Sequence, residues 1–192
     1  MNFENFFRSA YKIVGLDEKT IKAVNDDKKA VNFSLLMILL FAVISVVGFM
    51  MFPRTVIPGL AFYEPDLLSG ALMVLTTFLL AAGTYAAAGF LAEKVFNAKT
   101  KWDSYLKVLG LGQIVGFISI FPSLALVAWL WMLIIFLFMS RKVGKLDWGS
   151  IILLFAFTML AFVLMITVLK FMHLPILDYS YGVKVFDYVD MF

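Results

Sequence analysis

Cysteine is absent from the 192 residues, and histidine occurs once, as His173. The missing thiols exclude disulfides, thiolate nucleophiles and cysteine-ligated zinc or iron–sulfur sites. A single histidine does not make an ordinary zinc site, so we expect no metal and no other cofactor. Charged residues are also scarce, at 15% of the chain. Soluble domains carry about 25%, so this composition excludes a soluble enzyme and a disordered linker.

Apolar side chains make up most of the sequence instead. Hydrophobic residues account for 63% of it, phenylalanine alone occurs 21 times, and the mean hydropathy is +0.97. A helix needs roughly 20 apolar residues to cross a bilayer. The long uncharged stretches therefore predict an all-α polytopic membrane protein, a bundle of five transmembrane helices within residues 30–170. The predicted spans cover residues 30–53, 67–92, 102–121, 122–140 and 148–169.

The boundary between the third and fourth spans depends on one proline. Residues 108–140 contain no charged side chain and are too long for one crossing. Pro122 lies near the middle of this stretch, and proline ends or kinks a helix because it lacks a backbone donor. We therefore predict two helices here. The alternative is a single kinked and tilted helix, which would reduce the count to four spans.

Two segments flank the predicted membrane domain. Residues 1–29 begin with an amphipathic pattern whose opposite face carries Arg8 and Lys12. The apolar face consists of Phe3, Phe6, Phe7, Ala10 and Val14. This pattern predicts a cytoplasmic helix in the membrane interface, with docking to a cytoplasmic partner as the alternative. Residues 171–192 form an aromatic tail that we place outside the cell.

The basic residues indicate the orientation. With five spans, thirteen lysines and arginines fall on one side of the membrane and three on the other. Cytoplasmic loops are enriched in these residues. We therefore expect a protein of the plasma membrane with a cytoplasmic N-terminus and an external C-terminus. The same assignment explains the net charge of +3 without nucleic acid as a partner.

Small and polar residues inside the second and third spans predict close helix packing. Small residues spaced four apart let helix backbones approach closely in a membrane. The candidate packing positions are Ala82, Gly83, Ala86, Ala87, Gly112, Gly116 and Pro122. Gln113 and Ser119 are the polar residues at depth, and a hydrogen bond between helices is the favoured interpretation over substrate contact. The alternative to packing within one chain is packing between two copies.

The middle of the chain resembles the Yip family of five-span membrane proteins, over roughly residues 33–169. The resemblance rests on the basic aromatic loop 99–108, the Phe121–Pro122 hairpin and the basic loop 141–145. It also includes the glycines Gly110, Gly112 and Gly116 and the Ala128-Trp129-Leu130-Trp131 run. The resemblance implies a membrane adaptor or membrane-shaping protein of the kind associated with vesicle trafficking. The Asp-Leu-Tyr-Gly-Pro motif of eukaryotic members is missing, so GTPase binding is not carried over.

These features predict a non-enzymatic membrane scaffold, adaptor or membrane-shaping protein. No charged side chain lies centrally in any predicted span, which argues against ion-coupled transport. The partners we expect are the lipid bilayer, other membrane proteins or further copies of the chain, and no small-molecule substrate. The alternative is passive permeation or lipid handling. It would need a polar path lined by Thr76, Thr77, Thr84, Gln113 and Ser119.

Overall fold

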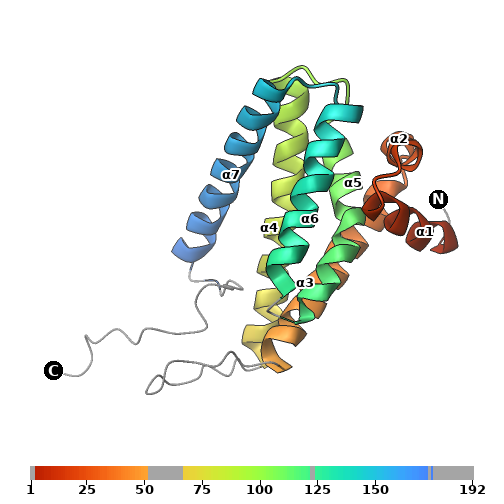
Figure 1. Cartoon of the computed structure of the whole chain (residues 1–192). Coiled ribbons are helices and arrows are strands. Elements are labelled where there is room, and N and C mark those ends of the chain that lie inside the picture. The colour runs from red at the N-terminus through yellow and green to blue at the C-terminus, as the bar shows by residue number, and fades with distance from the viewer. Residues whose placement is uncertain (1–2, 52–66, 122–123, 173, 175–192) are drawn as a thin grey trace.

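The fold is a bundle of helices, described by a computed structural model over residues 3–51, 67–121, 124–172 and 174. No strand occurs within these ranges, which confirms the all-α prediction. The elements are α1 (Phe3–Val14), α2 (Glu18–Asp26), α3 (Ala30–Met51), α4 (Leu67–Lys94), α5 (Asp103–Gly112), η1 (Gln113–Ile120), α6 (Ala125–Phe138), η3 (Met139–Val143) and α7 (Trp148–Phe171). Figure 1 shows the long helices side by side, with successive ones running in alternate directions.

Four of these helices are long and apolar enough to cross a membrane. They are α3, α4, α6 extended by the π-helical turn η3, and α7. Each begins and ends within three residues of a predicted span. Pro122 and the predicted tail, apart from Phe171, Met172 and Leu174, lie outside the described residues.

The predicted third span differs from the α-helix that we expected. It divides into α5 and the 3-10 helix η1, which starts at Gln113. Glycines at 110, 112 and 116 and the β-branched pair Ile114 and Val115 disfavour the α-helix, which accounts for the change. The chain nevertheless stays helical from Asp103 to Ile120, so the segment keeps one direction through the bundle.

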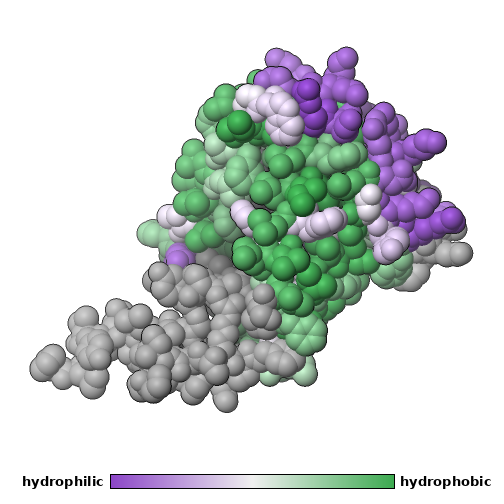
Figure 2. All heavy atoms as spheres, viewed as in Figure 1, coloured by the Kyte–Doolittle hydropathy of each residue, from purple (hydrophilic) through white to green (hydrophobic). Residues whose placement is uncertain are grey.

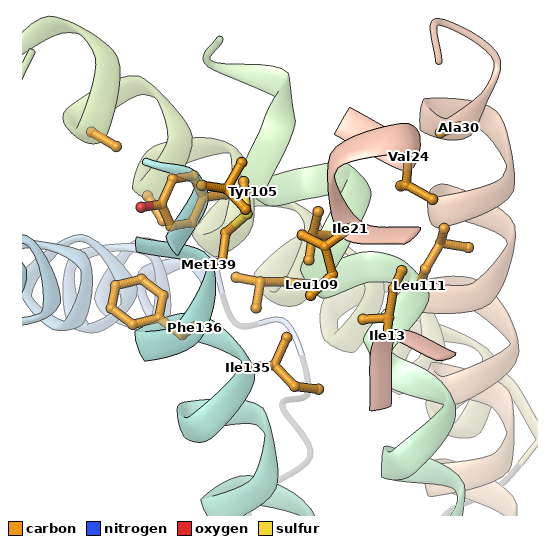
Figure 3. Close-up of a cluster of buried hydrophobic side chains, with 14 of the residues drawn as sticks. Ile13, Ile21, Val24, Ala30, Tyr105, Leu109, Leu111, Ile135, Phe136 and Met139 are labelled. Atoms are coloured by element: carbon orange, nitrogen blue, oxygen red, sulfur yellow. The ribbon is translucent and has the colours of Figure 1, made fainter. Parts of the chain in front are cut away.

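Helix α5 is the centre of the molecule. Every residue from Ser104 to Gly112 is buried, and α1, α2, α3, α4 and α6 all contact this helix. Figure 3 shows Tyr105, Leu109 and Leu111 of α5 among buried side chains of the surrounding helices. The Tyr105 and Ser140 hydroxyl oxygens are 2.8 Å apart and share a hydrogen bond, which joins α5 to η3. The central helix is therefore covered by protein around its circumference.

The N-terminal helix lies against this bundle. Phe6, Ala10 and Ile13 of α1 are fully buried, and the Phe6 ring stacks on Phe33 of α3. The Trp131 indole N–H donates to the Val14 carbonyl at 3.0 Å, which ties the end of α1 to α6. The buried face includes Ile13, which the sequence pattern missed, while Phe7 is 40% exposed. Much of the apolar face thus packs on the protein.

Most described basic residues lie on α1, α2 and the connections at one end of the bundle. The Lys99 N–H donates to the Gly144 carbonyl at 3.0 Å, which joins the α4–α5 connection to the turn before α7. Helix α2 packs beside η3 at the same end. Figure 2 shows hydrophilic residues at the top and along one side, next to a broad apolar surface. Among described basic residues, Lys170 alone lies at the opposite end of the bundle.

Candidate functional site: a cleft between α6 and α7

A cleft of about 340 Å³ lies between α6 and α7, with α3, α4, α5 and η1 behind it. Its volume falls within the range of about 300–1,000 Å³ that is typical of ligand pockets. Helix α7 packs mainly on α4, and α6 packs mainly on η1, so the two helices leave this space between them. Trp129 lines the cleft and is 52% exposed. The mouth therefore opens sideways, on the apolar surface of the bundle.

Aromatic and flexible apolar side chains form most of the wall. The aromatic members are Phe41, Tyr85, Trp129, Phe136, Phe155 and Phe162. Met132 and Met159 line it from the two sides of the mouth. Methionine adapts its shape to irregular contacts, and aromatic rings offer large apolar faces. This wall suits an apolar molecule whose shape varies.

A few uncharged polar groups lie at the back of the cleft. The Tyr85 hydroxyl donates to Gln113 Oε1, which links α4 to the start of η1. Gln113 is 5% exposed, and within the described residues its amide N–H groups have no acceptor. The Thr77 hydroxyl is buried without a hydrogen-bond partner. Buried polar groups are normally paired, so the Gln113 amide is available to a bound molecule, whereas the Thr77 oxygen is enclosed by protein.

Two other hydroxyls of the cleft are already satisfied by their own helices. Thr84 Oγ1 donates to the Leu80 carbonyl at 2.6 Å, and Thr158 Oγ1 donates to the Leu154 carbonyl at 2.7 Å. Every side chain that lines the cleft is uncharged. The polarity of the site thus comes from Thr77, Tyr85 and Gln113.

The structure brings together three of the five residues of the predicted polar path. Thr77, Thr84 and Gln113 all line the cleft. Thr76 instead donates to the Met73 carbonyl at 3.1 Å. Ser119 donates to the Gly116 carbonyl and lies 3.2 Å from the Ser45 hydroxyl, which joins η1 to α3. The polar residues therefore form one local site and a separate helix contact.

The predicted small residues contact several different helices. A Cβ atom on Gly83 would lie 2.7 Å from Met165 Sδ of α7, and one on Gly116 would lie 2.6 Å from the Phe41 ring of α3. A Cβ on Gly112 would meet Ile135 of α6 at 3.1 Å. Gly83, Gly112 and Gly116 thus pack on α7, α6 and α3, respectively. Ala82, Ala86 and Ala87 are half-buried on α4.

The closest backbone approaches involve glycines that the four-residue spacing did not identify. A Cβ on Gly48 would lie 2.6 Å from the Ile120 carbonyl oxygen, where α3 crosses η1. A Cβ on Gly89 would lie 1.7 Å from the Trp102 carbonyl oxygen. Because only the contact itself requires glycine at these positions, a spacing rule on one helix gives no signal for them.

Sequence reasoning also missed a buried ion pair. Lys107 was assigned to a basic loop, but it is 2% exposed on α5. Its Nζ lies 2.9 Å from Asp103 Oδ2 and donates to the Asn25 carbonyl of α2 at 2.9 Å. The spacing of four residues between Asp103 and Lys107 is the signal that could have placed both on one helix. Lys107 therefore connects α2 to the central helix α5.

The fold and the cleft define a class, a helical bundle with membrane-length helices and a lateral apolar cleft. Within the described residues, no group of three histidine or acidic side chains could hold a metal ion. Comparison with models of known protein families, with curated proteins and with solved structures finds no match.

Proposed function

We propose that this chain is a five-span integral membrane protein. Four crossings are the long apolar helices, and α5 together with η1 forms the additional crossing, which is third in chain order. Ten α-helical and eight 3-10 residues extend about 31 Å at their usual rises per residue. That length matches the hydrocarbon thickness of about 30 Å. The uncharged faces of the four long helices would then contact lipid, while α5 remains inside protein. The length of α5 together with η1 therefore supports the prediction of five spans, which came from the distribution of charged residues.

The proposed orientation in the plasma membrane places the end that carries α1, α2 and the basic connections in the cytoplasm. Enrichment of lysine and arginine at that end supports it. Arg8, Tyr11 and Lys12 are exposed on α1, opposite its buried face. In this orientation they would face lipid headgroups, so α1 lies at the interface while packing on the bundle.

The function that the geometry supports best is lipid handling without chemistry: the protein binds a membrane lipid in the cleft between α6 and α7. One observation carries this proposal. Thr77, Thr84 and Gln113, selected from the sequence as polar residues of the predicted spans, line a cleft together with six aromatic side chains, and the cleft opens on the apolar surface of the bundle. Apolar pockets with a few convergent polar groups are the usual form of small-molecule sites.

Photo-cross-linking in native membranes tests this proposal. A photoreactive residue replaces Met159, which lines the cleft, or Leu160, which is 54% exposed on the same helix. We expect a defined lipid adduct that is enriched at position 159 and a mixture of bulk lipids at position 160. The same mixture at both positions would refute specific binding in the cleft.

A second candidate function is that of a scaffold or adaptor. The observation that favours it is the N-terminal unit of α1 and α2, which is fixed to the bundle by Lys107 and Trp131 and presents a basic surface. The resemblance to the Yip family points the same way. Cross-linking from α1 or residues 93–107 should capture a stoichiometric protein partner if this candidate is correct. Recovery of the chain alone would contradict it.

A further inference from the structure

We infer that the ligand of the cleft is a neutral lipid with a carbonyl group, held by the Gln113 amide. The inference rests on the proposed lipid-binding function and specifies its ligand. It has three supports: the absence of charge in the cleft wall, the available donor, and the depth of that donor in the bundle.

Charge is the first support. The cleft wall contains threonine, tyrosine and glutamine as its polar residues, and no lysine, arginine, aspartate or glutamate. A phosphate or an ionised carboxylate buried there would have no countercharge, and burial of an unpaired ion is strongly unfavourable. A neutral polar group can enter at the cost of one or two hydrogen bonds to water, which the site can replace.

The available donor is the second support. Gln113 Oε1 already accepts from Tyr85, which orients the amide so that its nitrogen is the free end. An empty site leaves this donor without an acceptor, whereas a ligand acceptor would satisfy it. A carbonyl oxygen is such an acceptor.

Depth is the third support. Gln113 follows Gly112 at the junction of α5 and η1, ten residues along the segment that starts at Asp103. At the α-helical rise this is about 15 Å from the start of α5, near the middle of a core of about 30 Å. The headgroup of a phospholipid stays at the membrane surface, but a neutral lipid can bring its polar end to this depth. Its chains would then lie along the aromatic wall and Met159.

Fluorescence quenching by brominated lipids tests this assignment, because bromine quenches tryptophan on contact. Trp129 is the tryptophan that lines the cleft, so the signal is the quenching of the full chain minus that of Trp129→Phe. The protein is placed in phosphatidylcholine nanodiscs with a brominated lipid: diacylglycerol, its dialkyl ether analogue without carbonyls, or phosphatidylglycerol. We expect saturable quenching by diacylglycerol. Half-saturation by the ether analogue should need about tenfold more lipid, equivalent to about 1.4 kcal/mol.

Matched variants connect the result to the polar groups. The double variant Tyr85→Phe with Gln113→Leu removes both ends of the pair, and we expect about a tenfold weaker response to diacylglycerol. Ser119→Ala removes a hydroxyl from the same 3-10 helix outside the cleft and should leave the response unchanged. Circular dichroism and thermal melting confirm that each variant is folded.

Different outcomes test lipid binding in the cleft and the assignment of a neutral carbonyl lipid separately. Saturable quenching that is equal for the diacyl and ether lipids would overturn the carbonyl assignment, and quenching strongest for phosphatidylglycerol would overturn the assignment of a neutral lipid, while either result leaves lipid binding intact. An unchanged response in the double variant would also overturn it. If no brominated lipid gives saturable quenching of Trp129, the assignment and the proposed function both fail.

Discussion

Gly89 marks the tightest backbone contact among the described residues, because its Cα faces the Trp102 carbonyl at the start of the central segment. Alanine is ordinarily favoured over glycine in a helix by about 1 kcal/mol. Here the added methyl group would need a backbone shift, and overpacking costs about 1–3 kcal/mol or more. We predict that Gly89→Ala lowers stability by about 2 kcal/mol net, as measured by reversible unfolding in mixed micelles.

Gly70→Ala on the same helix is the matched control. A Cβ there would meet the end of the flexible Met50 side chain at 3.3 Å, which can move away. We expect its stability to be equal to or higher than that of the parent chain. Equal stabilities for the two variants would show that the space between Gly89 and the Trp102 carbonyl can accommodate a methyl group.

The Asp103–Lys107 pair gives a second prediction at the residue scale. Asp103→Asn removes the charge that compensates a nearly buried ammonium group. Breaking a fully buried pair costs about 3–5 kcal/mol. Because the Asp103 side chain is 20% exposed, we expect about 2 kcal/mol.

The double change Asp103→Leu with Lys107→Met should recover most of that loss, because it removes both charges from the buried site. Unfolding experiments on the two variants measure the difference. A double variant as unstable as Asp103→Asn would show that the bond from Lys107 to Asn25, rather than the charge pair, stabilises α2.

At the scale of elements, the start of α7 depends on an ionised cap. The Ser150 hydroxyl and then its backbone N–H donate to the Asp147 carboxylate, and these bonds hold the pKa of Asp147 below its ordinary value of 3.8. A lowered pKa means that the cap stabilises the fold above pH 3.8. Its contribution is lost as the pH falls through the pKa of the folded state.

Ser150→Ala should therefore raise the pKa of Asp147 toward 3.8, and the first turn of α7 should exchange its amide protons faster at low pH. Carboxyl-carbon NMR titration with amide exchange measures both effects. A pKa that does not change in the variant would assign the shift to the other backbone N–H groups at the start of the helix.

The elements also show how much the sequence can predict. The length of the stretches without charged residues was enough to locate α3, α4, α6 and α7, because a helix that faces lipid must be apolar along its whole length. The same criterion predicted an ordinary span at residues 102–121, but its division into α5 and η1 depends on local glycine content and on packing. The same criterion did not predict the burial of Lys107. Two charged residues close together in the sequence suggest a loop, whether or not they form an ion pair inside the protein.

The residues that line the cleft could be predicted only in part from the sequence. Polarity within the predicted spans selected Thr77, Thr84 and Gln113, which line the cleft, together with Thr76 and Ser119, which do not. It did not identify Trp129, Met132 or Met159, because the chain contains 21 phenylalanines, 11 methionines and 4 tryptophans, so a residue of these types gives no local signal. Which of them face a common space depends on the angles between α6, α7 and α4, and these angles follow from contacts between helices distant in sequence.

For the whole molecule, the account predicts that lipid in the cleft contributes to stability. A ligand that binds only the folded state raises the free energy of unfolding by RT ln(1 + [L]/Kd). Ala81→Phe would place a ring in the cleft from α4, and Leu79→Phe makes the same kind of change at an exposed position of that helix. The first variant should lose the bound lipid and keep its fold, whereas the second should retain both.

Lipid binding in the cleft can be measured by native mass spectrometry of the full chain and these two variants, released from membranes in mild detergent. We expect one bound lipid on the parent chain and on Leu79→Phe, and none on folded Ala81→Phe. A parent chain without lipid, or an Ala81→Phe variant that keeps its lipid at the same occupancy, would contradict the claim that the cleft between α6 and α7 is a lipid-binding site.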